Sequence, residues 1–191
     1  MKKVVLDDIL GFDAYEKVRD QSRDRIIQLK QKRRVSVGGR VSLVFENRDT
    51  VIFQIQEMLR AERIADLDKI REEIAVYNEL IPDPGQLSAT LFLEIDDQAY
   101  LREELLKFLG IDEVVFFKIG SHSIHGQFEK GRSKEDKISA VQYVRFPFDE
   151  GALEAFRKGE NAEISIDHPH YKATAPLETQ TRESLLDDLT N

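Results

Sequence analysis

The order of the alternating segments between residues 86 and 168 constrains the fold more than any other feature of the sequence. Four segments have strand character: 89–95 and 162–166 alternate apolar and polar residues, 114–119 is an apolar run, and 138–148 is a long strand. Segments with helical spacing follow the first and the third of them in chain order. The strands are expected at 89–95, 114–119, 138–148 and 162–166. This β-α-β-β-α-β order predicts an α+β fold in which the second half forms a ferredoxin-like sandwich or a similar mixed sheet.

The first 81 residues have the pattern of a helical part with a small hairpin. Helical spacing runs from Phe12 to about Arg33, and two short alternating segments at 35–37 and 41–45 flank Gly38-Gly39, a pair typical of tight turns. A second helix is expected to begin at a cap formed by Asp49 or Thr50 and to continue to about Ile64. A third is expected to begin at Asp66 and to end near Ile81.

The segment Pro82-Asp83-Pro84-Gly85 marks the clearest internal boundary, because two prolines and a glycine end the preceding helix. We therefore expect a helical and hairpin subdomain at 1–81, a sheet subdomain at 86–176 and a C-terminal helix at 177–191. The connecting turn is short, so the three parts are expected to pack as one globular unit.

Composition excludes several classes of protein. The chain has 191 residues, of which 41% are hydrophobic and 34% charged, and no apolar run approaches the roughly 18 residues of a membrane span. Asp7 and Asp8 interrupt the N-terminal segment before a secretory apolar stretch can form, so a cytoplasmic location is expected. The absence of cysteine excludes a cysteine-ligated iron–sulfur or zinc site.

The net charge of -8 argues against a general nucleic-acid-binding protein. A local basic cluster nevertheless ends the first helix, at Lys30, Lys32, Arg33 and Arg34. It has two interpretations: a surface for an acidic partner or for phosphates, or a solvated helix end whose cations the helix dipole favours.

The helix expected over 50–64 carries the densest group of candidate functional side chains. Glu57 and Arg60, three positions apart, are candidate catalytic residues, with Arg60 or Arg63 binding an anion and Glu57 acting as a base or metal ligand. Five polar residues in or before this helix are candidate binding residues: Glu46, Arg48, Gln54, Gln56 and Arg63. The alternative interpretation is a polar network that joins the helix to the sheet.

All four histidines fall in two short motifs, SHSIH with His122 and His125, and DHPHY with His168 and His170. Neutral imidazole is a common metal ligand, and Asp167 could ligate the ion or orient His168, so these five residues are candidate metal ligands. The alternative is that Asp167 and His168 form a hydrogen-bonded turn while the remaining histidines are exposed.

Four segments together resemble a bacterial family of functionally uncharacterised proteins of about this length, known only as a domain of unknown function. They are FENRDTVIFQIQEMLRAERI at 45–64, YNELIPD at 77–83, DKISAVQYVRF at 136–146 and IDHPHY at 166–171. Tyr171, which ends the last motif, is a further candidate binding residue. The family carries no assigned activity. The resemblance implies a genomic neighbourhood of rubrerythrin-like and iron–sulfur proteins, and so a partner of that kind.

Two functional hypotheses follow. The first is a cytoplasmic, non-catalytic accessory or binding protein, linked through the resemblance to electron transfer or peroxide defence. The second is a metal-dependent enzyme in which Glu57, Arg60 and His168 meet at one site. The sequence specifies neither a cofactor nor an oligomeric state.

Overall fold

The structure, a computed structural model, describes residues 1–95, 98–129, 133–134 and 137–190. Its described residues form six α-helices: α1 (Phe12–Lys32), α2 (Arg48–Ala61), α3 (Leu67–Asn78), α4 (Leu101–Leu106), α5 (Glu150–Arg157) and α6 (Thr179–Thr190). Single 3₁₀ turns occur at η1 (Leu6–Asp8), η2 (Gln98–Tyr100) and η3 (Ile111–Glu113). The strands are β1 (Arg34–Val37), β2 (Val41–Glu46), β3 (Gln86–Leu93), β4 (Val115–Ile119), β5 (His122–His125), β6 (Gln127–Phe128), β7 (Ser133–Lys134), β8 (Lys137–Ile138), β9 (Val141–Pro147), β10 (Ala162–His168) and β11 (Tyr171–Pro176).

Two antiparallel sheets organise the strand-rich part of the molecule. The first sheet has the order β1-β2-β3-β9-β6 and the second the order β11-β10-β4-β5, while β7 and β8 form a separate two-stranded ribbon. Alternation within the strands gives each sheet one apolar face. In β9, for example, Val144 and Phe146 are buried with Gln142 on one face, while Tyr143 and Arg145 lie on the other.

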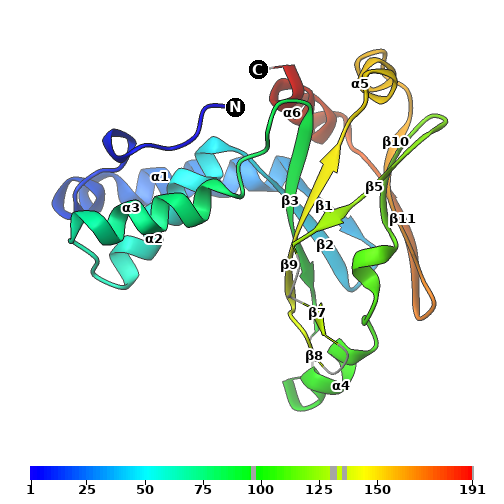
Figure 1. Ribbon diagram of the computed structural model, residues 1–191, viewed down its shortest axis with the longest axis horizontal. Coiled ribbons are helices and arrows are strands. Elements are labelled where there is room, and N and C mark those ends of the chain that lie inside the picture. The colour runs from blue at the N-terminus through cyan, green and yellow to red at the C-terminus, as the bar shows by residue number, and fades with distance from the viewer. Residues whose placement is uncertain (96–97, 130–132, 135–136, 191) are drawn as a thin grey trace.

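The main core lies between the two sheets, because their apolar faces pack against each other. Phe117 of the second sheet meets Phe45 and Phe146 of the first at ring-centroid distances of 6.1 and 5.7 Å. Helices α5 and α6 close one end of this sandwich, and the segment containing α4 covers the other (Figure 1).

The first three helices form a separate layer that extends to one side of the first sheet (Figure 1). They have their own small apolar core, centred on Val51, Ile55 and Leu59 of α2 together with Ile74 of α3. Since α2 begins directly after β2, this layer is anchored to the sheet at Glu46 and Asn47. No helix within the described ranges combines the length and the apolar character needed to cross a membrane.

The predicted α+β class, with a helical N-terminal part and a strand-rich remainder, is confirmed. The β-α-β-β-α-β order is also present, but its strands are divided: β3 and β9 lie in the first sheet, and β4 and β10 in the second. A ferredoxin-like sandwich would place all four in one sheet, and the ladders between the described strands are antiparallel. Alternation shows that one face of a strand is buried, but it does not show which strand lies beside it.

The predicted hairpin is present, with Val37 paired to Val41 across Gly38-Gly39. It does not stay within the helical part, because β2 also pairs with β3 across the turn at 82–85. The division at 1–81, 86–176 and 177–191 stays a prediction. The cap of α2 is Asn47 rather than Asp49 or Thr50: its side chain accepts a hydrogen bond from the Thr50 amide at 3.0 Å, and the Thr50 hydroxyl accepts from the Asn47 amide. Asp66 caps α3 as predicted.

Candidate functional site

Glu46, at the end of β2, is the centre of a buried polar cluster. Only 2% of this residue is exposed, and its carboxylate accepts hydrogen bonds from three neutral groups. The Thr50 hydroxyl donates at 2.5 Å, the Gln54 amide at 3.0 Å and the Thr90 hydroxyl at 2.7 Å. Because Thr90 belongs to β3, the cluster joins the start of α2 to the first sheet.

Gln56 and Arg48 hold the N-terminal segment against α2. The Gln56 side chain is buried and forms two hydrogen bonds with the backbone of Leu10, one at 2.7 Å and one at 3.2 Å. Arg48 pairs with Asp8 at 2.5 Å, whereas its Nε is buried and has no partner among the described residues. A backbone hydrogen bond from Val5 and the Arg48 guanidinium lower the pKa of Asp8.

Glu57 lies between α1 and α2. Its carboxylate accepts from the Tyr15 hydroxyl at 2.9 Å and from two nitrogens of Arg19 at 2.8 and 2.7 Å. Arg19 and then Tyr15, by hydrogen bonding, lower the pKa of Glu57 despite the opposing effect of burial. Arg60 forms an ion pair with Glu16 of α1. Arg63, just beyond α2, is exposed and has a left-handed backbone conformation (φ 55°). These contacts join two helices.

Replacing Glu57 with glutamine should therefore lower the free energy of unfolding by about 1 kcal/mol at pH 7, after allowance for partial solvent screening. The pKa of Glu57 is lower in the folded state than in the unfolded chain, so the contribution of the charge is complete above about pH 4.3 and disappears as the pH falls through the folded value. Urea unfolding of both proteins at pH 7 and pH 3.5 measures this. Exposed Glu62, replaced in the same way, is the control; equal losses for both variants would contradict the account.

His168 is buried at the end of β10 and has a defined tautomer. Its Nε2 lies 2.8 Å from the carbonyl oxygen of Leu109, which can only accept, and its Nδ1 accepts from the amide of His170 at 3.2 Å. Both ring nitrogens of a neutral imidazole are thus used within the protein. The Tyr171 hydroxyl donates to the carbonyl of Val37 at 2.5 Å and fills the space that a side chain would need at Gly38 (φ 69°).

The other predicted metal ligands have separate surroundings. His125 Nε2 lies 3.0 Å from the carbonyl oxygen of Glu113, and Asp167 pairs with Lys172 at 2.7 Å. His122 lies beside Gly151, and His170 is exposed. Within the described part of the chain, no three or more histidine or acidic side chains gather in a way that could hold a metal ion.

The three candidate catalytic residues are not brought together. Glu57 and Arg60 contact α1, in the helical layer, whereas His168 contacts the segment after α4 at the far side of the sandwich (Figure 1). No contact between the described atoms joins His168 to either of the others.

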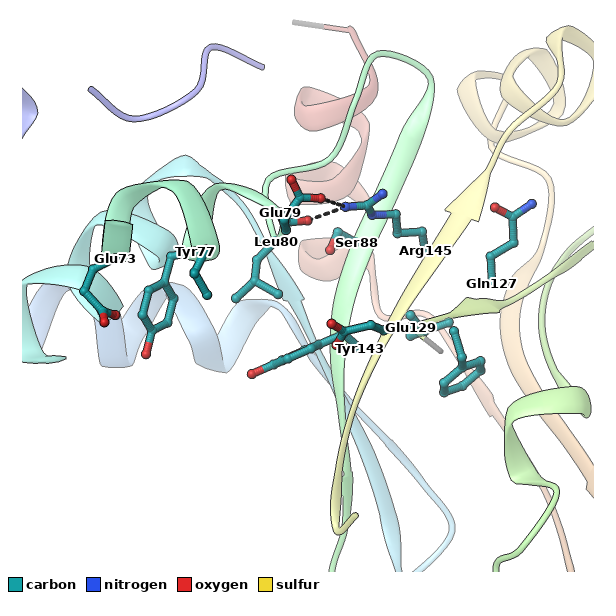
Figure 2. Close-up of a pocket in the computed structure, with 12 residues that line it drawn as sticks. Glu73, Tyr77, Glu79, Leu80, Ser88, Gln127, Glu129, Tyr143 and Arg145 are labelled. Carbon is teal, nitrogen blue, oxygen red and sulfur yellow. Dashed lines mark hydrogen bonds and ion pairs between the residues drawn. The ribbon is translucent and has the colours of Figure 1, made fainter. Parts of the chain in front are cut away.

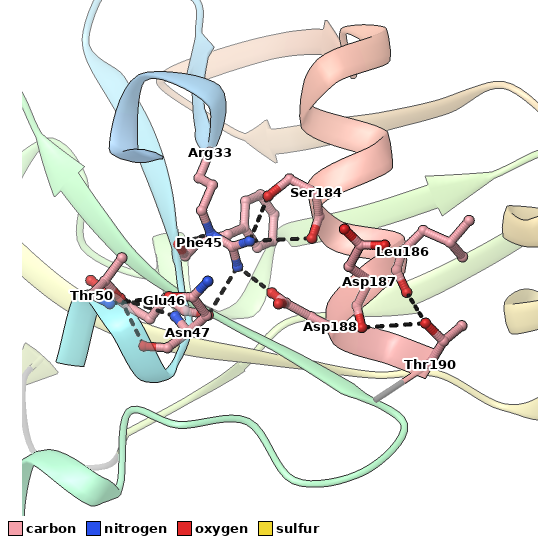
Figure 3. A network of polar contacts seen from close by, with 10 residues as sticks. All are labelled: Arg33, Phe45, Glu46, Asn47, Thr50, Ser184, Leu186, Asp187, Asp188 and Thr190. Atoms are coloured by element: carbon pink, nitrogen blue, oxygen red, sulfur yellow. Dashed lines mark hydrogen bonds and ion pairs between the residues drawn. The ribbon is translucent and has the colours of Figure 1, made fainter. Parts of the chain in front are cut away.

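The two arginines of the basic cluster at the end of α1 differ, because Arg33 is buried and Arg34 forms a partly exposed ion pair. Arg33 is only 1% exposed, and its guanidinium donates to the carbonyl oxygens of Phe45 and Glu46 and to Ser184, and it pairs with Asp188 of α6 (Figure 3). Arg34 contacts Ser42 and Glu94. Arg33 is therefore part of the fold and is unavailable to an external phosphate.

A groove of about 640 Å³ lies between α3 and the outer face of the first sheet (Figure 2). Its walls include Tyr77 and Leu80 on one side and Tyr143 on the other. Ser88 and Arg145 belong to its floor, where they are direct cross-strand partners. A pocket of this size is typical of sites for small molecules.

The strand register connects this groove to the buried cluster around Glu46. Glu46 is paired with Ser88, Ser88 with Arg145, and Arg145 with Gln127, so these four residues form one row across the outer face. In the next row Thr90, which donates to Glu46, is paired with Tyr143. The N-terminal end of α2, with its cluster around Glu46, therefore lies beside the groove floor.

Polar groups in the groove differ in how they are satisfied. Arg145 donates to the carbonyl of Glu79 at 2.5 Å and to its carboxylate at 3.2 Å. The Ser88 hydroxyl, on a residue that is 3% exposed, makes no hydrogen bond with the described residues. Burial, followed by the charges of Glu73, Tyr143 and Glu62, raises the pKa of Tyr77. The α3 side of the groove is thus acidic.

Sequence reasoning did not single out this groove. Its lining residues come from separate segments of the chain, and Ser88 and Gln127 belong to no sequence motif. One signal was available: in Gln142–Pro147, Tyr143 and Arg145 occupy the face opposite Val144 and Phe146, which is an unusually large and polar outer face for a strand covered by a helix.

Comparison with known proteins agrees with the observed fold. A crystal structure of a novel protein of unknown function from Burkholderia pseudomallei K96243 is similar, with a TM-score of 0.93 and 33% sequence identity over 98% of this chain and 100% of that chain. No curated protein matches the sequence. The model of the family described as "Protein of unknown function (DUF3501)" matches residues 3–189. The chain therefore belongs to the DUF3501 family.

Proposed function

We propose that this protein is a non-catalytic accessory protein that binds a small molecule in the groove between α3 and the outer face of the first sheet. The supporting observation is the groove itself: its volume of about 640 Å³ and its combination of the Tyr77 and Tyr143 rings with the Ser88 hydroxyl on its floor. Ligand sites commonly combine apolar walls with a few placed polar groups. The candidate catalytic residues, in contrast, are engaged in contacts between structural elements.

Filling the groove should abolish retention of its ligand. Val76 lines the groove from α3 and is 66% exposed, so Val76→Trp adds bulk there at little cost to folding. Each protein is incubated with a metabolite extract, separated from free compounds and examined by native mass spectrometry. We expect a retained compound with the wild type and loss of at least about 90% of it with Val76→Trp, which corresponds to a tenfold weaker affinity at low ligand concentration.

The matched control is Val18→Trp, which places the same side chain on an exposed position of α1. It should retain the compound as well as the wild type does. Retention that survives Val76→Trp, or no retained compound at all, would contradict the proposal. Recovery of the compound in chemically altered form would contradict its non-catalytic part.

We propose further, from the family resemblance, that the protein acts in the cytoplasm beside an iron–sulfur or rubrerythrin-like protein. Since the chain has no cysteine, it would not carry a cysteine-ligated cluster itself and would serve an accessory role. Sedimentation of this protein mixed with a purified rubrerythrin-like protein should give a faster species than either alone. Unchanged sedimentation at concentrations of about 50 μM would contradict an affinity in the micromolar range.

A further inference from the structure

We infer that the ligand of the groove is an organic cation, an ammonium or guanidinium group carried on an apolar body. This inference rests on the proposed binding function and names the chemical class of the ligand. It follows from the charges, the aromatic walls and the unpartnered hydroxyl of the groove.

The charges that line the groove favour a positive ligand. Three glutamates and one arginine line it: Glu73, Glu79, Glu129 and Arg145. Arg145 is already paired with Glu79, so its charge is largely compensated within the protein. Glu73 makes no ion pair with any described residue, and its carboxylate borders the same space as Tyr77. An anionic ligand would have to approach the carboxylate of Glu73 without a cation to offset it.

The aromatic walls suit the same ligand. Figure 2 shows the Tyr143 ring extending from β9 toward α3, where Glu73 and Tyr77 are placed. A cation near the face of a tyrosine is attracted by the ring, and the apolar body of the ligand can pack on Leu80. The α3 end of the groove therefore combines a carboxylate with two aromatic rings.

The Ser88 hydroxyl provides an independent indication of a ligand. Ser88 is 3% exposed and lies on the groove floor, and its hydroxyl forms no hydrogen bond with the described residues. Its oxygen can accept a hydrogen bond from an ammonium or guanidinium N–H that enters the groove.

Three probes of similar shape and different charge test the inference: 2-phenylethylammonium, 3-phenylpropionate and 2-phenylethanol. Each is titrated into the wild-type protein while the backbone amide NMR signals of Tyr77, Ser88 and Tyr143 are followed. We expect the ammonium to shift these signals with an affinity at least about tenfold higher than that of the carboxylate or the alcohol.

Single substitutions identify the residues that bind the ammonium probe. Glu73→Gln should weaken binding of the ammonium by about fivefold, whereas Glu72→Gln, at the neighbouring exposed position of α3, should not change it. Ser88→Ala should also weaken binding but should leave the midpoint of thermal unfolding unchanged, because its hydroxyl contributes no hydrogen bond to the fold.

Carboxylate or alcohol binding at the groove as tight as that of the ammonium would overturn the cation inference while leaving the proposed binding function intact. The absence of shifts at all three residues with every probe would also overturn it; the metabolite experiment with Val76→Trp reports separately on the binding function.

Discussion

Replacing Arg33 with methionine should lower the free energy of unfolding by about 3–5 kcal/mol, because it leaves Asp188 and several carbonyl oxygens without their buried cation. The side chains of Arg33 and Asp188 are 1% and 8% exposed, and the pair joins α6 to the end of β2. Urea denaturation at pH 7 measures the loss. Arg34→Met, next in the chain with a largely solvated ion pair, should lose less than about 1 kcal/mol.

The same pair predicts a pH dependence with a definite sign. Burial raises the pKa of Asp188 and Arg33 partly opposes this, so removing Arg33 should raise that pKa further. A folded-state pKa above the unfolded value means that stability falls as the pH rises between the two. The loss of unfolding free energy caused by Arg33→Met should therefore be smallest at acidic pH. Combining Arg33→Met with Asp188→Leu should recover part of this loss at pH 7. A loss below about 1 kcal/mol for the single variant would contradict this account.

Phe117→Ala should be as damaging, at about 3–5 kcal/mol, because the ring is fully buried where the two sheets meet. It contacts Phe45 and Phe146 of the first sheet, and it also meets Phe148 and Phe156 at 5.3 and 5.8 Å. Removing it leaves a cavity between the sheets.

Phe116→Ala is the matched control, because Phe116 is the preceding residue of the same strand. It lies on the other face, is only partly buried, and its ring packs against His125 in a tilted arrangement. Its loss should cost about 1 kcal/mol. Urea unfolding of both variants gives the two losses of unfolding free energy, which can be compared directly if the m-values are equal. Equal losses would contradict a core that lies between the sheets.

The local elements could be predicted from sequence because they depend on nearby residues. Helical spacing located α1 and α3, the Gly38-Gly39 pair located the hairpin, and alternation located β3 and β10. The pairing of strands could not be predicted in this way. A strand such as β4 has the same apolar sequence whether it lies beside β3 or, as here, between β10 and β5.

Prediction of the candidate site from sequence was limited in the same way, because long-range contacts cannot be deduced from residue spacing. The sequence indicated that polar residues gather around α2, but the partners of Glu46 and Glu57 depend on contacts with β3 and α1 that no spacing specifies. Histidines drew attention through their chemistry, although His168 is used to hold the chain after α4. Ser88 belongs to the groove because the register places it between Glu46 and Arg145, and the register cannot be deduced from the sequence.

A crystal structure of the protein grown with 2-phenylethylammonium tests most directly whether the groove is a binding site for an organic cation. We expect the ring between α3 and the first sheet, with the ammonium nitrogen within hydrogen-bond distance of Ser88 Oγ or the Glu73 carboxylate. A probe bound elsewhere on the protein, with the groove between Tyr77 and Tyr143 unoccupied, would contradict the account.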